Sequence, residues 1–394
     1  MGTDVIDAKI YHSSTLGRSL DGPWGVLAST AAAGLGPLVL EVDGDHWTYS
    51  YLDGTLHVLA GAIEDPWVRV SMSSIAWSDL ASSTRTFISL QLAGELEIAH
   101  GSFSRLSRWE CALRALYLGV PAYDPERVAL VDDVDAPIDL AATVSLDDDN
   151  AYLASRLATT GYLHVAGVLS SEEVAQLADE AVRVAGLMDR SDPFTWWAER
   201  PDGSDVLCRV IYAHRMSPLL GDLADDPRMR RLAGLLGSPV ESFLDRMDGP
   251  TLLMKPPGPL RGLSNLPWHQ DCGLGGHPVI CPAVSLGIQI TAASTERGCL
   301  EVIAGSHGQS IPAGIDVDAM ETWPRVAVET QPGDVTVHVM DVLHASPPPT
   351  GEGGRTTLYL SYYPPTLSEH IGPGEAVNDM IRGRQLDAEA ARGI

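Results

Sequence analysis

The second half of the chain is a series of short β-like segments, and this pattern most limits how it can fold. From about residue 250 onward, apolar runs are separated by Gly- and Pro-rich turns: TLLMK, VSLGIQIT, CLEVIAG, VTVHVM and TLYLSYYP. Residues 150–188, which precede them, contain helical patterns around one short strand, YLHV. Helices followed by many short strands are typical of an α+β domain built around a barrel or a double sheet.

The first part of the chain differs, because there the β-like runs come before a helix. Three runs in PLVLEVDGDHWTYSYLDGTLHVLAG are joined by Asp43-Gly44 and Asp53-Gly54, and Asp-Gly pairs favour tight hairpin turns. WVRVSMS and TFISLQLAGELEIAHG add further runs, and SRLSRWECALRALYLG has apolar residues at helical spacing. We expect a meander of about five strands closed by a helix.

An Asp- and Pro-rich stretch separates these two patterns and predicts a linker that crosses the surface. The sequence therefore predicts three parts. A small α+β domain occupies residues 1–125, the linker residues 126–147, and a second domain residues 148–394.

Charge and composition argue against several classes of protein. The net charge of −26 argues against binding to nucleic acid and to anionic membranes. The five cysteines have no CxxC spacing, which argues against a disulfide framework and predicts a cytoplasmic protein. The opening MGTDVIDAKIYH lacks the apolar core of a signal peptide, and prolines interrupt the uncharged residues 22–40, so we expect no transmembrane helix.

The stretch LPWHQDCGLGGHP contains the first half of a candidate metal site. His269 and Asp271 are two positions apart, so on a strand both side chains point to the same face. An H-x-D triplet alone is a weak signal, but a second histidine, His344, ends a later β-like run in the segment PGDVTVHVMDVLHAS. Two histidines and one carboxylate form the facial triad that leaves coordination positions open at Fe(II).

A candidate anion site follows in GRTTLYLSYYP. Arg355 and Thr357 are again two apart and share one face of the predicted strand. A guanidinium binds a carboxylate through two hydrogen bonds, and a hydroxyl can add a third. The pair therefore suits the far carboxylate of a cosubstrate such as 2-oxoglutarate.

Five motifs in this order resemble the phytanoyl-CoA dioxygenase family of Fe(II)/2-oxoglutarate oxygenases: LLMKPPG, WHQD, RGCLEVIAGSH, PGDVTVHVMDVLHAS and GRTTLYLSYYP. GYLHVAGVLSSEEVAQL is also similar to that family's opening segment, so the resemblance covers roughly residues 148–368. It implies a double-stranded β-helix (jelly-roll) fold. The chain departs from the family at Ala304, where a proline is common.

The resemblance assigns roles to individual residues. It implies that His269, Asp271 and His344 are the iron ligands and catalytic centre, and that Arg355, assisted by Thr357, binds 2-oxoglutarate. Further cosubstrate-binding candidates are, on the same basis, Lys255 and, from their alternation in GIQIT, Gln289 and Thr291. Iron(II), 2-oxoglutarate and O2 are the expected cofactors.

Several other residues near the motifs have a structural interpretation as well as a functional one. His277 follows two glycines and could contact substrate, but a fourth protein ligand would close the site to O2. We interpret Cys272 as a buried, inert thiol, His307 as a structural loop residue, and His338 as part of the core or the cavity wall.

The expected reaction is hydroxylation of an unactivated C–H bond, with release of succinate and CO2. Asp271 argues against halogenation, because related halogenases have Ala or Gly there. Desaturation, epimerisation or cyclisation at the same iron centre stay open. The alternative from another class is a lipid-binding or carrier protein with a vestigial oxygenase domain.

The N-terminal residues resemble the sterol-carrier-protein-2-like domain over roughly residues 35–120. This implies an apolar tunnel, or instead a packed domain that mediates docking or homo-oligomerisation. The expected substrate is a hydrophobic or carrier-linked small molecule, such as a natural product. Trp196 and Trp197 in TWWAERPDG could stack on a ring of this substrate, or pack at a helix end.

Overall fold

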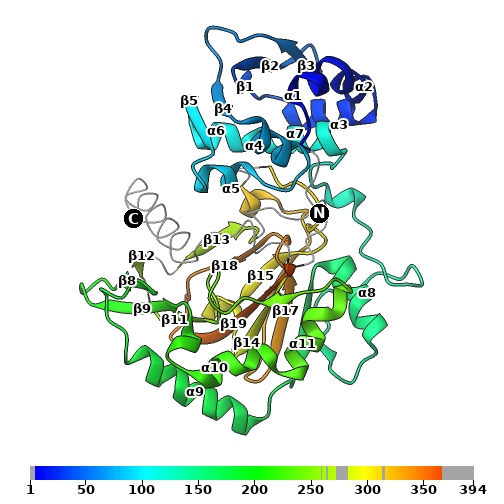
Figure 1. Cartoon of the computed structure of the whole chain (residues 1–394). Helices are drawn as coiled ribbons and strands as arrows, with labels where there is room; N and C mark the ends of the chain where they lie inside the picture. The colour runs from blue at the N-terminus through cyan, green and yellow to red at the C-terminus, as the bar shows by residue number, and fades with distance from the viewer. Residues whose placement is uncertain (1–4, 259, 263–264, 272–282, 313–315, 366–394) are drawn as a thin grey trace. The chain divides into compact units, whose positions relative to one another are not determined.

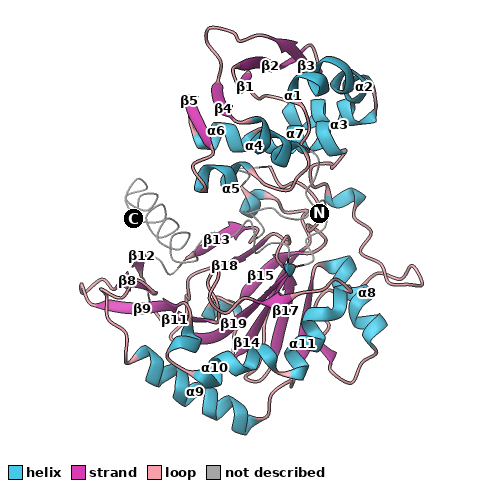
Figure 2. Ribbon diagram, viewed as in Figure 1, coloured by secondary structure: helices cyan, strands magenta, loops and turns pink. Residues whose placement is uncertain are grey.

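The computed structural model is shown in Figures 1 and 2, and it describes residues 5–258, 260–262, 265–271, 283–312 and 316–365. The chain divides into two compact units. Unit 1 contains the residues up to Asp124 together with Gly308–Glu321. Unit 2 contains Pro125–Asp271, Cys281–His307 and the residues from Thr322 onward.

Unit 1 combines one five-stranded sheet with short helices. The helices before the sheet are α1 (Ala8–Ile10), the π-helix η1 (Tyr11–Thr15), α2 (Leu16–Asp21) and α3 (Pro23–Ala32). The strands are β1 (Leu38–Val42), β2 (Asp45–Leu52), β3 (Thr55–Ala60), β4 (Val68–Met72) and β5 (Leu96–His100), in the order β3-β2-β1-β4-β5. The remaining elements are α4 (Ser74–Ala81), α5 (Phe87–Leu92), α6 (Phe103–Arg108), α7 (Glu110–Leu118) and the 3-10 helix η7 (Val317–Ala319).

The predicted hairpins of unit 1 are confirmed, but the complete meander is wrong. Both Asp-Gly turns have positive φ at each residue, and they join β1, β2 and β3 as consecutive antiparallel strands. β4, however, returns beside β1 and runs parallel to it. TFISLQL is also not a strand, because the Thr86 side chain accepts from the Ser89 amide and begins helix α5.

Aromatic side chains fill the core of unit 1. Trp77, Trp109 and Tyr49 are fully buried between the sheet and the helices. Within this core, Nε2 of His12 lies 2.6 Å from the Tyr49 hydroxyl, which lies 2.6 Å from the hydroxyl of Tyr117. Burial of these large rings removes apolar surface from water and so helps to hold the sheet and the helices of unit 1 together.

Unit 2 begins with the segment predicted to be a linker and a group of helices. Residues 125–147 lie against this unit, where the Tyr162 hydroxyl donates to the carbonyl of Leu140 at 2.5 Å. The α-helices are α8 (Asn150–Thr160), α9 (Ser171–Ala185), α10 (Pro218–Asp222) and α11 (Pro227–Ala233). The 3-10 helices are η2 (Pro125–Arg127), η3 (Ala213–Arg215), η4 (Leu223–Asp225), η5 (Gly234–Leu236) and η6 (Thr295–Arg297). In the described ranges, no helix has both the length and the apolar character needed to cross a bilayer.

Two sheets form the centre of unit 2. The large sheet contains β6 (Val144–Ser145), β7 (Tyr162–Ala166), β8 (Thr195–Glu199), β9 (Asp205–Val210), β10 (Glu241–Ser242), β11 (Thr251–Lys255), β12 (Arg261–Gly262), β14 (Val284–Gln289), β17 (Val335–Val339) and β19 (Arg355–Tyr363). The small sheet has the order β13-β18-β15-β16, with β13 (Leu266–His269), β15 (Leu300–Ile303), β16 (Arg325–Val328) and β18 (His344–Ser346). Within these two sheets, all strand pairings except that of β6 with β7 are antiparallel. Helices and sheets together make the chain a mixed α+β protein.

Strand alternation gives the large sheet one unusually polar face. On β19, Leu358 and Leu360 are fully buried on one side, whereas Arg355 and Thr357 are buried on the other. The polar face continues onto the neighbouring strands, where Lys255 pairs with Arg355 and Gln289 pairs with Thr357. Buried polar groups need partners, so this face is where a polar ligand would be bound.

Hydrogen bonds of the Asp334 side chain connect the beginning of β17 to the segment around β7. Its carboxylate accepts hydrogen bonds from His164 Nε2 at 2.8 Å, the Gly167 amide at 2.9 Å and the Gln331 amide at 2.8 Å. Burial alone would raise the pKa of Asp334, but these hydrogen bonds outweigh it and hold the pKa below its usual value. The ionised carboxylate therefore stabilises the folded state.

We expect Asp334→Ala to lower the free energy of unfolding by about 2–3 kcal/mol, because buried donors lose their acceptor. Since the folded-state pKa is depressed, this contribution is present above the ordinary carboxyl pKa of about 4 and is lost as the pH falls through the folded value. Urea unfolding of both proteins at several pH values measures the effect. A difference between wild type and variant that is constant from pH 7 to pH 3 would contradict it.

Candidate metal centre

The two histidines predicted as ligands are direct neighbours across two strands. His269 at the end of β13 pairs with His344 at the start of β18, and their ring centroids are 4.2 Å apart. β18 also pairs with β15, where Val302 is opposite His344. The small sheet therefore brings together two imidazoles from distant parts of the sequence.

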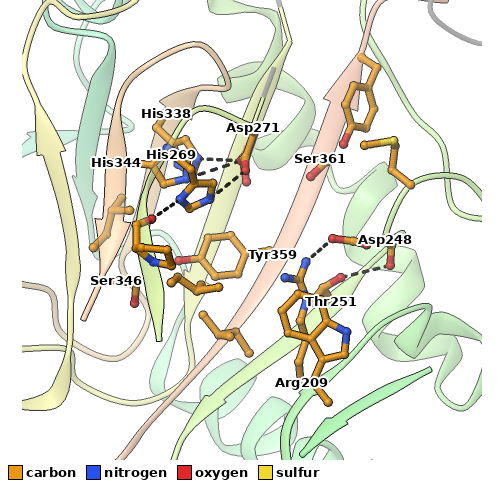
Figure 3. A pocket seen from close by; sticks show the side chains of 18 residues that line it. Arg209, Asp248, Thr251, His269, Asp271, His338, His344, Ser346, Tyr359 and Ser361 are labelled. Atoms are coloured by element: carbon orange, nitrogen blue, oxygen red, sulfur yellow. Dashed lines mark hydrogen bonds and ion pairs between the residues drawn. The ribbon is translucent and has the colours of Figure 1, made fainter. Parts of the chain in front are cut away.

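Asp271 completes a group of three candidate ligands (Figure 3). Its Oδ1 lies 3.3 Å from Nε2 of His269, and its Oδ2 lies 3.7 Å from Nε2 of His344. One ligand atom from each of the three residues lies within 4.8 Å of the other two. Strand β13 ends at His269, so Asp271 reaches the group from the segment that follows the strand.

Backbone carbonyls fix the orientation of both imidazoles. Nδ1 of His269 lies 2.6 Å from the carbonyl of Pro267, and Nδ1 of His344 lies 2.9 Å from the carbonyl of Val342. With the proton on Nδ1, each ring directs the lone pair of Nε2 toward Asp271. Such an outer hydrogen bond is what sets the tautomer of a metal-ligating histidine.

The charges of the three groups also suit a cation. Burial, together with the neighbouring His269, lowers the pKa of His344 to about 3, so this imidazole is neutral at pH 7. Burial would raise the pKa of Asp271, but the imidazoles around it outweigh burial and hold its pKa well below the usual range. Asp271 therefore contributes a negative charge and His344 a neutral nitrogen donor. Burial would lower the pKa of His269, but its hydrogen bond to Asp271 outweighs burial and raises this pKa.

A second polar cluster lies beside this group on the large sheet. Arg355 is 2% exposed; it donates to the Ser346 hydroxyl at 2.7 Å and to the Thr357 hydroxyl at 3.4 Å. Thr357 donates to Gln289 Oε1 at 3.0 Å. Lys255 is 1% exposed, and its Nζ donates to the carbonyls of Ser346 and Pro347.

Arg355 has unused hydrogen-bonding capacity. Among the described residues, its buried Nε has no hydrogen-bond partner, and the partners of its other nitrogens are neutral hydroxyls. A buried guanidinium without an anionic partner is unfavourable. The cluster therefore has the chemistry of a site for a carboxylate, and Ser346 links it to the strand of His344.

The other predicted site residues lie in different surroundings. Thr291 follows the end of β14, and its hydroxyl accepts from the Thr356 amide at 2.8 Å. Trp196 lines the cavity beside the histidines, whereas the indole of Trp197 donates to the Thr195 hydroxyl at 2.7 Å. His277 and Cys272 lie outside the described residues.

A cavity of about 360 Å³ opens next to the three candidate ligands. Sequence reasoning did not identify Arg209 and Asp248, which form an ion pair on its wall, with the guanidinium 4.4 Å from the ring centroid of Trp196 (Figure 3). It also missed Tyr359 and Ser361, although their alternation with Arg355 and Thr357 on β19 was a usable signal. No comparable alternation pattern in the sequence indicated Arg209 and Asp248.

The residues present fit a divalent transition metal such as iron. Two imidazole nitrogens and one carboxylate oxygen are the donors of the facial triad, and one such atom from each residue lies within 4.8 Å of the other two. The hydrogen bonds at both Nδ1 atoms match the outer shell of such a site. Fold and donor set together define an oxygenase-like class of non-haem metal protein.

Comparison with known proteins gives the family. Residues 157–357, just over half of the chain, match the model of the phytanoyl-CoA dioxygenase (PhyH) family, and the chain belongs to this family. Ectoine dioxygenases of Bordetella bronchiseptica and Bordetella parapertussis are each 30% identical over 159 residues, which are 38% of this chain and 47% of those proteins. The chain thus spans about half the length of the curated relatives that it matches.

Three solved structures illustrate the likeness. AviO1 from Streptomyces viridochromogenes Tue57 is 28% identical, with 55% of this chain and 96% of AviO1 covered and a TM-score of 0.45. The epimerase SnoN from nogalamycin biosynthesis is 25% identical, with coverages of 55% and 86% and a TM-score of 0.43. EctD from S. alaskensis is 22% identical, with coverages of 65% and 86% and a TM-score of 0.47.

Proposed function

We propose that the protein is an Fe(II)- and 2-oxoglutarate-dependent dioxygenase that hydroxylates an unactivated C–H bond of a small molecule. The observation that carries this proposal is the combination of His269, Asp271 and His344 in one group with the buried, under-used guanidinium of Arg355 next to it. Membership of the phytanoyl-CoA dioxygenase family supports it. In this proposal, the two sheets of unit 2 correspond to a double-stranded β-helix.

Each residue has a definite task in the proposed reaction. His269, His344 and Asp271 hold the metal, while the carbonyls of Pro267 and Val342 keep both imidazoles in the ligating tautomer. Arg355 binds the far carboxylate of 2-oxoglutarate, with the Thr357 hydroxyl held in place by Gln289. Iron(II) held by these residues would activate O2, which is the oxidant for C–H cleavage, and 2-oxoglutarate would be converted to succinate and CO2 as the co-reductant.

Lys255 stabilises this arrangement through hydrogen bonds to backbone carbonyls. It ties β11 to the carbonyls of Ser346 and Pro347, directly after the strand that carries His344. Burial and the neighbouring Arg355 lower the pKa of Lys255 well below its usual value. A cosubstrate carboxylate bound near both cations would offset their mutual repulsion.

The cavity favours a substrate with both apolar and polar parts. Trp196, Leu253 and Leu300 provide apolar surface, whereas the Arg209–Asp248 pair presents a donor and an acceptor to the same space. A natural-product-like small molecule with a ring and polar substituents would satisfy both. In the proposed assignment, Trp196 stacks against the substrate and Trp197 has no direct contact with it.

Unit 1 is proposed to act as a sterol-carrier-protein-2-like module that binds a lipid or the substrate, or that mediates homo-oligomerisation. Its core is filled by buried aromatic side chains such as Trp77 and Trp109, which supports the packed docking or homo-oligomerisation role over the apolar tunnel. Under the alternative that the oxygenase is vestigial, unit 1 would carry the whole function. Desaturation, epimerisation or cyclisation remain alternative outcomes at the same iron centre.

Anaerobic addition of Fe(II) and 2-oxoglutarate to the metal-free protein tests the proposal. We expect a weak visible charge-transfer band that needs both additions, and slow release of succinate once air is admitted. His269→Ala should remove both signals. If metal-replete wild-type protein gives neither the band nor succinate, the oxygenase proposal is wrong and the vestigial alternative gains support.

A further inference from the structure

A third imidazole, that of His338, lies beside the candidate ligands. It comes from β17 of the large sheet, opposite Ser285 on β14 and Tyr162 on β7, and its side chain is 2% exposed. Its ring centroid is 4.6 Å from that of His344. Its Nε2 lies 3.5 Å from Oδ2 of Asp271, and Figure 3 shows three imidazoles around this one carboxylate.

His338 differs from the two ligand histidines in how its ring is held. His269 and His344 each have Nδ1 within 2.9 Å of a carbonyl oxygen two residues earlier. Among the described residues, neither ring nitrogen of His338 has a hydrogen-bond partner. Because metal-ligating imidazoles almost always donate their other N–H to an outer group, His338 lacks the support of a ligand.

A buried imidazole with two unsatisfied nitrogens is unfavourable, so its place needs an explanation. The acceptor that its Nε2 approaches is Oδ2 of Asp271, and 3.5 Å is only a few tenths of an ångström beyond a normal hydrogen bond. Oδ2 also lies 3.7 Å from Nε2 of His344, whereas the other carboxylate oxygen, Oδ1, faces His269. A small movement of Asp271 would therefore give His338 a charge-assisted hydrogen bond.

We propose that His338 is a positioning residue that donates its Nε2 proton to Oδ2 of Asp271 when the metal is bound. The carboxylate then offers a single oxygen, Oδ1, to the metal instead of chelating it with both. Binding through one oxygen keeps one more coordination position open for cosubstrate and O2. This inference rests on the metal site of the proposed function and assigns to His338 a role outside the ligand set.

Cobalt(II) binding to the metal-free protein tests this role without turnover. His338→Leu keeps a similar volume but removes the donor, and His338→Gln keeps an N–H close to the position of Nε2. We expect His338→Leu to weaken cobalt(II) binding by roughly 10- to 100-fold, measured by competition with a coloured chelator. His338→Gln should stay within about threefold of wild type, because the donor to Oδ2 is retained.

The control is His307→Leu, which removes a half-buried imidazole of unit 2 whose Nε2 lies 2.8 Å from the carbonyl of Ala158. It should leave cobalt(II) affinity unchanged. Thermal unfolding of each variant monitors folding, and His338→Met is a second donor-free variant in case His338→Leu does not fold.

The remaining outcomes overturn the assignment. Equal affinity of wild type and the donor-free variants would make His338 a packing residue only. Equal losses in His338→Gln and His338→Leu, with a changed cobalt(II) absorption band, would make it a ligand. If wild type itself binds no cobalt(II), the metal site of the proposed function fails as well, which distinguishes that failure from a wrong role for His338 alone.

Discussion

Replacing His344 with alanine is expected to weaken Fe(II) or cobalt(II) binding by roughly 100- to 1,000-fold, since each ligand of such a site supplies several kcal/mol. Succinate formation from 2-oxoglutarate should fall below detection. The reason is local: His344 is held by the Val342 carbonyl and directs Nε2 at the group formed with His269 and Asp271. Metal titration and a succinate assay on the same preparation measure both effects.

Two comparisons make this prediction specific. His307→Ala, outside the metal group, should leave metal affinity and succinate formation unchanged. Added imidazole should restore part of the metal binding of His344→Ala, because His344 lines the cavity and its removal leaves room for a free ring. Metal binding by His344→Ala equal to that of wild type would remove His344 from the ligand set.

The grouping of His269, Asp271 and His344 could be expected from sequence because the H-x-D spacing, the later histidine and the family resemblance all indicated these three residues. His344 was expected at the end of the run that begins at Val335, but β17 ends at Val339 and His344 begins the separate strand β18 of the small sheet. The family resemblance, rather than this run, placed His269 and His344 in one site. Their direct cross-strand pairing was beyond reach, since register between strands so distant in sequence depends on the whole sheet. The alternation of side chains along a strand did not fully justify the choice of Asp271 as a ligand, because Asp271 lies after the end of β13.

Failures of the sequence prediction have equally local causes. Thr291 was expected on the same strand and the same face as Gln289. β14 ends at Gln289, so strand alternation does not extend to Thr291. Trp196 and Trp197 were treated as a pair, although neighbouring residues of a strand point to opposite faces. The helix α5 was expected to be a strand because an apolar run this short does not distinguish the two.

Arg209 and Asp248 show what sequence alone cannot supply. They lie on β9 and in the segment before β11, and no spacing rule connects them. Their ion pair exists because β9 and β11 are neighbours in the large sheet. Residues that select a substrate are commonly of this kind, since they are brought together by tertiary structure and vary independently of the metal motif.

The last prediction concerns Arg355 and separates cosubstrate binding from metal binding. Arg355→Leu is expected to weaken 2-oxoglutarate binding by about 2–5 kcal/mol, roughly 30- to 4,000-fold, because a buried charge-assisted pair loses one partner. Affinity for cobalt(II) should stay close to that of wild type, since Arg355 contacts Ser346 and Thr357 and none of the candidate ligands. Calorimetric titration with 2-oxoglutarate in the presence of cobalt(II) measures the loss.

A cosubstrate analogue without the far carboxylate provides the matched control for this variant. 2-Oxovalerate keeps the chelating 2-oxo acid and the chain length of 2-oxoglutarate but has no far carboxylate. Wild type should therefore prefer 2-oxoglutarate strongly, whereas Arg355→Leu should bind both compounds with similar affinity. If the variant retains the wild-type preference, another cation must bind that carboxylate, and Lys255, which pairs with Arg355 across β11 and β19, would be the next residue to replace.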